Sequence, residues 1–227
     1  MNLEEFKNQN IRNKYEINDH FGKIITLIDF GNVNYWYEKD ERDEEGELLK
    51  KNDKLIVDIE KMADFCSSFS RQIKFYYGLD QKQKKSFYLI KKARKCLGKT
   101  NAVTKNIQYI KHYLDSSEKD GNTRSLNYNK KGSYVYIPKC NFDVEICIDT
   151  IRLLDKYDTL CLFSGDSDFV SLLRFIKQKN KKVILIKGGP TVRELKSEAD
   201  LILSSQSIKK ELAIKKSDLL KKQKSRP

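Results

Sequence analysis

Short, fully apolar runs recur along this 227-residue chain, and two of them lead directly into aspartates. The runs are KIITLID at 23–29, TLCLF at 159–163 and KVILIK at 182–187. Runs of this kind are typical of strands buried on both faces of a parallel sheet. Asp29 ends the first run, and Asp166 follows the second by three residues. Because ligands bind beyond the carboxyl ends of such strands, we expect both aspartates at one rim of the sheet.

The segments between these runs alternate between helical and strand-like patterns. Helices are predicted where apolar residues recur at helical spacing, over residues 55–69, 82–97, 143–156 and 168–179. A capping box of Thr191 and Glu194 predicts one more helix, to about Ala199. Further strands are predicted over residues 72–78, 106–114, 134–137 and 200–203. Pro138 should stop the third of these. Alternating strands and helices predict an α/β fold, a mainly parallel sheet with helices on both faces.

The same pattern suggests one domain over residues 22–205, preceded by a polar lead-in at 1–21. Two polar stretches look like insertions, a charged one at 38–54 and a turn-rich one at 115–133 that should form a long loop or hairpin tip. Residues 206–227 are rich in lysine and are expected to form a basic helix, over about 207–224, or a frayed tail.

The formal net charge is +13, which favours a nucleic-acid or anionic-surface partner. A generally lysine-rich proteome would give the same charge. The five cysteines include no C-x-x-C pair, so zinc-ribbon spacing is absent and a reducing compartment is expected. The first residues have no apolar signal core, and no apolar run reaches membrane-spanning length, so we expect a cytoplasmic protein with no membrane partner. Whether the protein forms a homo-oligomer stays an open question.

Carboxylates from distant parts of the chain should meet at the rim. Asp29 is followed by Asn32 in the next turn, Asp143 opens a predicted helix, and Asp166 and Asp168 lie in the loop after TLCLF. Clustered carboxylates stay ionised together only with cations present. Oxygen-rich sites without histidine suit Mg²⁺ or Mn²⁺, which can lower the pKa of a water and neutralise charge on a phosphodiester.

Each aspartate alone has a simpler explanation. Asp29 could be a turn former, and Asp143 and Asp168 could be charges favoured at a helix start. Asp149 lies six residues after Asp143, about 120° around the helix, so it could be a buried ion-pair member or a supporting group. The joint arrangement is more specific than any of its parts, because one topology brings all the distant acids to one rim.

Four segments resemble a known family: IDFGNVN, FDVEICIDTIRLL, LFSGDSDFVSLLRFIKQKNKKVILI and EADLILS. Together they resemble the NYN domain of the LabA-like group, which belongs to the PIN-like nuclease fold, over roughly residues 22–205. The resemblance implies a three-layer sandwich and a Mg²⁺- or Mn²⁺-dependent ribonuclease with a carboxylate metal site.

Residue by residue, the resemblance makes Asp29, Asp143, Asp166 and Asp168 the metal ligands and catalytic carboxylates. It makes Asn32, Ser164 and Asp149 supporting groups. One departure concerns a substrate lysine. The family often has Lys-Gly directly ahead of its helix-borne acid, whereas here the segment reads KCNFD, so that Lys139 is shifted by one.

A second set of residues predicts contacts with RNA. The helix at 82–97 interleaves cations with Phe87 and Tyr88, and cations beside stacking rings suit single-stranded RNA. An ordinary solvated helix face explains the same pattern. Three aromatic residues, Tyr35, Trp36 and Tyr37, follow the Asp29 turn and could line a cleft or pack the nearby insertion, with cleft-lining favoured for Trp36. The predicted RNA-binding residues are Trp36, Lys84, Lys85, Lys91, Lys92, Arg94 and Lys139.

These observations favour a metal-dependent ribonuclease, most simply an endonuclease, that acts on single-stranded or structured RNA. The alternative is a non-catalytic RNA-binding or regulatory module of the same fold. Two other phosphoryl-transfer folds fit less well. Haloacid-dehalogenase-like phosphatases need D-x-D after the first strand, whereas Asp29 is followed by Phe30 and Gly31. Toprim modules need a glutamate at the end of the first strand, where this chain has Asp29.

Overall fold

The computed structural model describes residues 2–115 and 124–224. Its centre is a six-stranded sheet in which all neighbouring strands are parallel. The strand order is β10 (Leu201–Ser204), β9 (Lys182–Lys187), β8 (Thr159–Phe163), β1 (Ile24–Asp29), β3 (Ser70–Leu79) and β4 (Ala102–Asn106). The predicted α/β fold with a mainly parallel sheet is confirmed.

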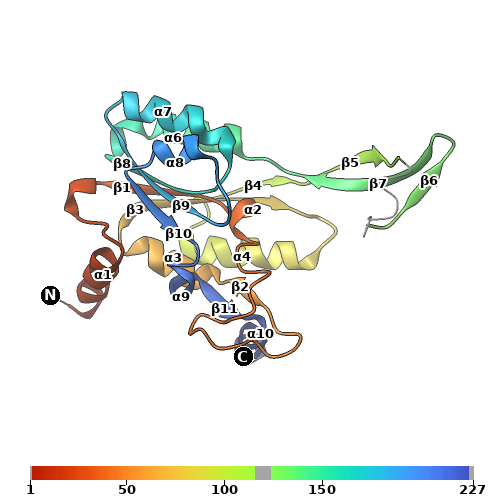
Figure 1. Cartoon of the computed structure of the whole chain (residues 1–227), viewed down its shortest axis with the longest axis horizontal. Helices are drawn as coiled ribbons and strands as arrows, with labels where there is room; N and C mark the ends of the chain where they lie inside the picture. The colour runs from red at the N-terminus through yellow and green to blue at the C-terminus, as the bar shows by residue number, and fades with distance from the viewer. Residues whose placement is uncertain (1, 116–123, 225–227) are drawn as a thin grey trace.

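Helices cover both faces of this sheet, as Figure 1 shows. Ile25 and Leu27 of β1 pack on one face, and Ile24 and Ile28 pack on the other, as strand alternation requires. The first face is covered by α6 (Asp143–Arg152), α7 (Val170–Gln178) and α8 (Arg193–Ser197). The second is covered by α3 (Ile59–Ser67), α4 (Lys84–Leu97) and α9 (Lys209–Leu212). β1 is therefore buried on both sides, and its carboxyl end opens at the rim between β3 and β8.

The prediction of a helix over 55–69 is wrong for its first residues. Residues Leu55–Val57 form β2, which pairs antiparallel with β11 (Ala213–Lys215) near the other end of the chain. The helix α3 begins only after Asp58, whose carboxylate accepts hydrogen bonds from the backbone N–H groups of Glu60 and Lys61. This cap fixes the helix start at a point that apolar spacing alone does not show.

The strand predicted over 106–114 corresponds to Gln108–Tyr113, and the strand before it, β4, was not predicted. β4 joins the edge of the main sheet, the chain turns at Ile107, and β5 (Gln108–Tyr113) leaves it. β5 pairs with β7 (Gly132–Lys139), which pairs in turn with β6 (Asn127–Asn129). We call this antiparallel sheet the arm, because it projects from the body of the molecule (Figure 1).

Pro138 does not stop its strand, contrary to the prediction. β7 runs through Pro138 because β6 reaches only to Tyr134, so that beyond this point β7 is paired on one side only. A proline is tolerated where its missing N–H faces no neighbouring strand. The predicted loop or hairpin tip at 115–133 lies partly outside the described residues, and its later part forms the β6–β7 hairpin.

Helix ends also differ from the sequence predictions. The helix predicted over 143–156 ends at Arg152 and is followed by a 3-10 turn at Leu154–Lys156, and a 3-10 turn at Ser167–Phe169 precedes α7. The capping box predicted for Thr191 is wrong. Val192 precedes α8, no side chain caps it, and the buried Thr191 hydroxyl has no hydrogen-bond partner among the described residues. The helix ends at Ser197.

Both termini are more ordered than the sequence suggested. The lead-in contains α1 (Leu3–Lys14) and a 3-10 turn at Asp19–Phe21. The C-terminal segment forms α9, β11 and α10 (Lys216–Lys224) instead of one helix.

In the 38–54 stretch, the buried Asp43 carboxylate lies 2.6 Å from Lys215 Nζ of β11. The division into lead-in, domain, insertions and tail stays a prediction. Among the described helices, none is long and apolar enough to cross a membrane.

Candidate metal centre

Asp29 ends β1 at the rim, directly before the short helix α2 (Phe30–Val33). Its carboxylate accepts a hydrogen bond from the Ser164 hydroxyl, at 3.3 Å. The side-chain oxygen of Asn32 accepts one from the backbone N–H of Gly165, at 3.4 Å. These two bonds tie the end of β1 to the loop after β8, so the two predicted supporting residues do hold neighbouring strand ends together.

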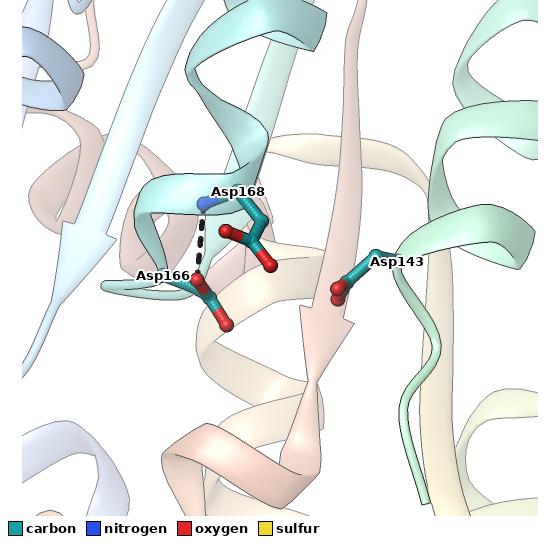
Figure 2. A group of neighbouring side chains, drawn as sticks. All are labelled: Asp143, Asp166 and Asp168. Carbon is teal, nitrogen blue, oxygen red and sulfur yellow. Dashed lines mark hydrogen bonds between the residues drawn. The ribbon is translucent and has the colours of Figure 1, made fainter.

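The loop after β8 places two more carboxylates. The backbone N–H of Asp166 donates to the buried Ser164 hydroxyl at 3.2 Å, and the Asp166 carboxylate accepts from the Asp168 N–H at 3.0 Å. Asp166 thus caps the 3-10 turn that begins α7. The same bond holds the Asp168 backbone against Asp166, as the dashed line in Figure 2 marks.

Asp143 reaches this loop from the first turn of α6. Asn141 fixes it from both sides. Its side-chain N–H₂ donates to the Asp143 carboxylate at 2.5 Å, and its side-chain oxygen accepts from the Asp143 backbone N–H at 2.7 Å. Carboxylate oxygens of Asp143, Asp166 and Asp168 all lie within 4.8 Å of one another, and Figure 2 shows them facing one space. This acidic cluster could hold a metal ion.

Asp29 lies beside the cluster rather than within it. It lines a cleft of about 420 Å³ together with Asp143 and Asp166, but its oxygens are not among those within 4.8 Å. Burial raises the pKa of Asp29 to about 6, and repulsion from the Asp143 and Asp166 carboxylates adds to the effect. Burial also raises the pKa of Asp143, with Asp166 and Asp168 contributing. The cleft is therefore a place where added positive charge is favourable.

Asp149 points away from the cluster. Its carboxylate lies 2.6 Å from Lys74 Nζ on β3 and accepts a 2.7 Å hydrogen bond from the Tyr76 hydroxyl. The Lys74 and Asp149 side chains are only 16% and 14% exposed. Of the two possibilities left open by its helical offset, the geometry supports the buried ion pair.

The predicted RNA-binding cations divide into two groups. The exposed ones are Lys84, Lys85, Lys91, Arg94 and Lys139. Lys92 is different, because its ammonium lies 3.0 Å from Asp58 and 3.5 Å from Glu60 and its side chain is 12% exposed. It joins α4 to the start of α3 and does not face solvent, so its assignment to RNA binding is wrong.

Trp36 packs instead of lining the cleft. Its ring stacks on the buried Phe163, with ring centroids 6.1 Å apart, and its indole N–H donates to Asn32 at 3.3 Å. A side chain at Gly188 would collide with this ring, since its Cβ would lie 2.4 Å from Trp36. The preceding residue, Tyr35, is the one that lines the cleft, and it is 64% exposed.

Sequence reasoning missed Asn141 and Lys105, and it favoured Trp36 over Tyr35 as the residue that lines the cleft. Lys105 of β4 pairs with Glu145 of α6 at 2.8 Å and so fixes the helix that carries Asp143. The position of Asn141, two residues before a helix-opening aspartate, is a capping signal that could have been noticed. Lys105 gave no such signal, because the strand that carries it was not predicted.

The chain matches the NYN domain family over residues 23–206. The chain belongs to the NYN domain family. This NYN domain is also 31% identical over 75 residues to the low amplitude and bright protein LabA of Synechococcus elongatus. That match covers 33% of this chain and 40% of the LabA protein, so it spans less than half of the relative's length.

A solved structure shows the same fold. It is a protein of unknown function from Vibrio parahaemolyticus, VPA0982, with a TM-score of 0.54 and 22% sequence identity. The likeness covers 87% of this chain and 99% of that one. The family match confirms the resemblance to NYN domains, and the likeness to this solved structure supports the fold alone.

Asp29 should lower the stability of the metal-free protein as the pH rises from about 4 to about 6. Asp29 has a pKa of about 6 in the fold, against about 3.9 in an unfolded chain. The unfolded chain therefore releases this proton first, and ionising Asp29 in the fold costs free energy until about pH 6, where the loss levels off. In urea unfolding of metal-free protein, Asp29→Asn should gain stability relative to wild type across this window. Parallel pH profiles for the two proteins would contradict this account.

Proposed function

We propose that this NYN domain is a metal-dependent ribonuclease that hydrolyses RNA phosphodiester bonds. Asp143, Asp166 and Asp168 would hold a Mg²⁺ or Mn²⁺ ion, and Asp29 would stabilise it from the side of the sheet. The observation that carries the proposal is the convergence of the Asp143, Asp166 and Asp168 carboxylates within 4.8 Å of one another, on a chain whose net charge is +13.

The donor set fits such an ion. The carboxylate oxygens are hard ligands, and no histidine is present in the cluster or in the described lining of its cleft. Cys140 lines the cleft, but its thiol is not among the clustered ligand atoms. A bound divalent ion supplies Lewis-acid chemistry, polarising the phosphodiester and neutralising its developing charge. Asn141 and Ser164 hold Asp143 and Asp166 in place through the bonds described above, so the ligands are positioned before the ion arrives.

RNA is the proposed partner because of the charge and the family. The exposed lysines of α4 and Lys139 would contact its phosphates. Placement in the cytoplasm and a possible homo-oligomer stay predictions.

A labelled RNA incubated with Mn²⁺ or Mg²⁺ should be cleaved, and excess EDTA should stop the reaction. A circular single-stranded RNA separates the two modes of action, because only an endonuclease can open it. We expect the circle to be opened. The alternative function, a non-catalytic RNA-binding module, would bind the same RNA and leave it uncut with every divalent metal tested.

A further inference from the structure

One face of the arm carries a row of tyrosines. In the β5–β7 register, Lys111 lies opposite Tyr136 and Tyr113 lies opposite Tyr134. Because alternate residues of a strand point to the same face, these four residues share a face with Tyr109. We call this set, Tyr109, Tyr113, Tyr134 and Tyr136 with Lys111, the tyrosine face.

Three rings of the tyrosine face, those of Tyr113, Tyr134 and Tyr136, form a continuous series. Ring centroids are 5.7 Å apart between Tyr113 and Tyr134 and 5.6 Å apart between Tyr134 and Tyr136. Lys111 Nζ lies 4.2 Å from the Tyr134 centroid. Tyr113 and Tyr136 are 40% and 43% exposed, so their rings keep surface that a ligand could cover. Partly exposed aromatic rings beside a cation are typical of a binding surface and not of a packed core.

The tyrosine face continues into a groove that meets the acidic cleft. Tyr109 and Tyr136 line this groove, of about 750 Å³, together with Lys82, just before α4, and Lys85 in its first turn. The groove and the cleft of Asp29, Asp143 and Asp166 share four lining residues, so one surface leads from the carboxylates to the arm. The shared residues are Tyr35, Tyr77, Ile107 and Pro138.

The base of the arm is fixed to the domain. The Tyr109 hydroxyl donates to the Asp80 carboxylate at 2.6 Å, and Asp80 also accepts from the Gln83 side chain and the Lys82 backbone N–H. The charge of Asp80 is thereby engaged within the protein. Lys82 Nζ lies 4.3 Å from the Tyr109 ring centroid, which leaves the groove with cations and rings along its wall.

We propose that the tyrosine face is a stacking platform for single-stranded RNA that extends from the acidic cleft. Unpaired bases would stack on the tyrosine rings, while Lys82, Lys85 and Lys111 contact the phosphates. A duplex cannot use the platform, because its bases are already stacked on each other. The proposal rests on the proposed function for the identity of the ligand, and it explains why an arm projects beside the cleft.

The test measures binding rather than cleavage, so it is independent of whether the carboxylates catalyse. A fluorescent single-stranded RNA of about twelve nucleotides is titrated in EDTA with the full chain. Tyr134→Ala and Tyr136→Ala should each weaken binding about fivefold or more, as the loss of one stacked base requires. Tyr136→Phe keeps the ring and should bind within about twofold of wild type. A hairpin duplex of the same length should bind wild type and both alanine variants alike.

The matched control is Tyr128→Ala. Tyr128 is 71% exposed on the same arm, and it lies opposite Ser133, so it points to the other face. It should bind RNA like wild type. The proposal is overturned if the alanine variants bind as tightly as wild type, or if Tyr128→Ala weakens binding equally. It is also overturned if the variants change the oligomeric state in sedimentation and leave RNA affinity unchanged, since the face would then join copies of the chain. If the wild-type protein binds RNA but does not cleave it in Mn²⁺, the proposed ribonuclease function is rejected. The stacking platform would still be accepted or rejected by the RNA affinities of the tyrosine variants.

Discussion

Asp166→Asn should lower the rate of RNA cleavage at least about 100-fold, because a metal ion supplies several kcal/mol of charge stabilisation in the transition state. The asparagine oxygen can still accept the hydrogen bond from the Asp168 N–H, so the 3-10 turn before α7 should survive. One of three neighbouring negative charges is removed. The metal-free variant should therefore melt no lower than wild type, which separates a lost ligand from a lost fold.

The matched control for this variant is Asp155→Asn. Asp155 is an exposed carboxylate in the 3-10 turn after α6, just before β8 begins and hence at the opposite end of the sheet from the cluster. It should cleave at the wild-type rate. Cleavage by Asp166→Asn at the wild-type rate, with Mn²⁺ or Mg²⁺, would show that the cluster does not carry the reaction.

Asp149→Leu should destabilise the protein by about 3 kcal/mol, at the low end of the cost of breaking a buried ion pair. The change leaves the ammonium of Lys74, whose side chain is 16% exposed, without its 2.6 Å partner and removes the acceptor of the Tyr76 hydroxyl. Urea unfolding at neutral pH measures the loss. Affinity for Mn²⁺ should stay unchanged, because Asp149 faces β3 and not the cluster.

A second variant distinguishes an unpaired charge from a poorly packed side chain. Replacing both partners, Lys74→Met with Asp149→Leu, should recover most of the lost stability, since an apolar pair can substitute for a buried ion pair. Unchanged stability in Asp149→Leu, combined with weaker Mn²⁺ binding, would instead assign Asp149 to the metal site.

Much of the site could be predicted because it depends on one rule. Apolar runs that end in aspartates, combined with the rule that parallel strands present ligands at their carboxyl ends, brought Asp29 and Asp166 to one rim. The detail of the cluster could not be predicted in this way. Asp168 joins Asp143 and Asp166 while Asp29 lies beside them, and that order depends on the turns made by Asn141 and Ser164.

What failed depended on contacts between distant residues. Lys92 has the same local sequence signal as the exposed Lys91, and only the packing of α4 on α3 turns it towards Asp58. The strand at Leu55–Val57 needs its partner at Ala213–Lys215, which no local pattern shows. The tyrosine face is visible in sequence as alternation, but its function depends on a hairpin register that places Tyr134 beside Tyr113.

Crystals soaked in MnCl₂ test the central claim most directly. Anomalous scattering should show a manganese ion within about 2.3 Å of carboxylate oxygens from Asp143 and Asp166, with Asp168 completing the same site. Crystals of Asp166→Asn should show no ion there. An empty cluster in wild-type crystals at millimolar Mn²⁺, or an ion bound only elsewhere, would contradict the account.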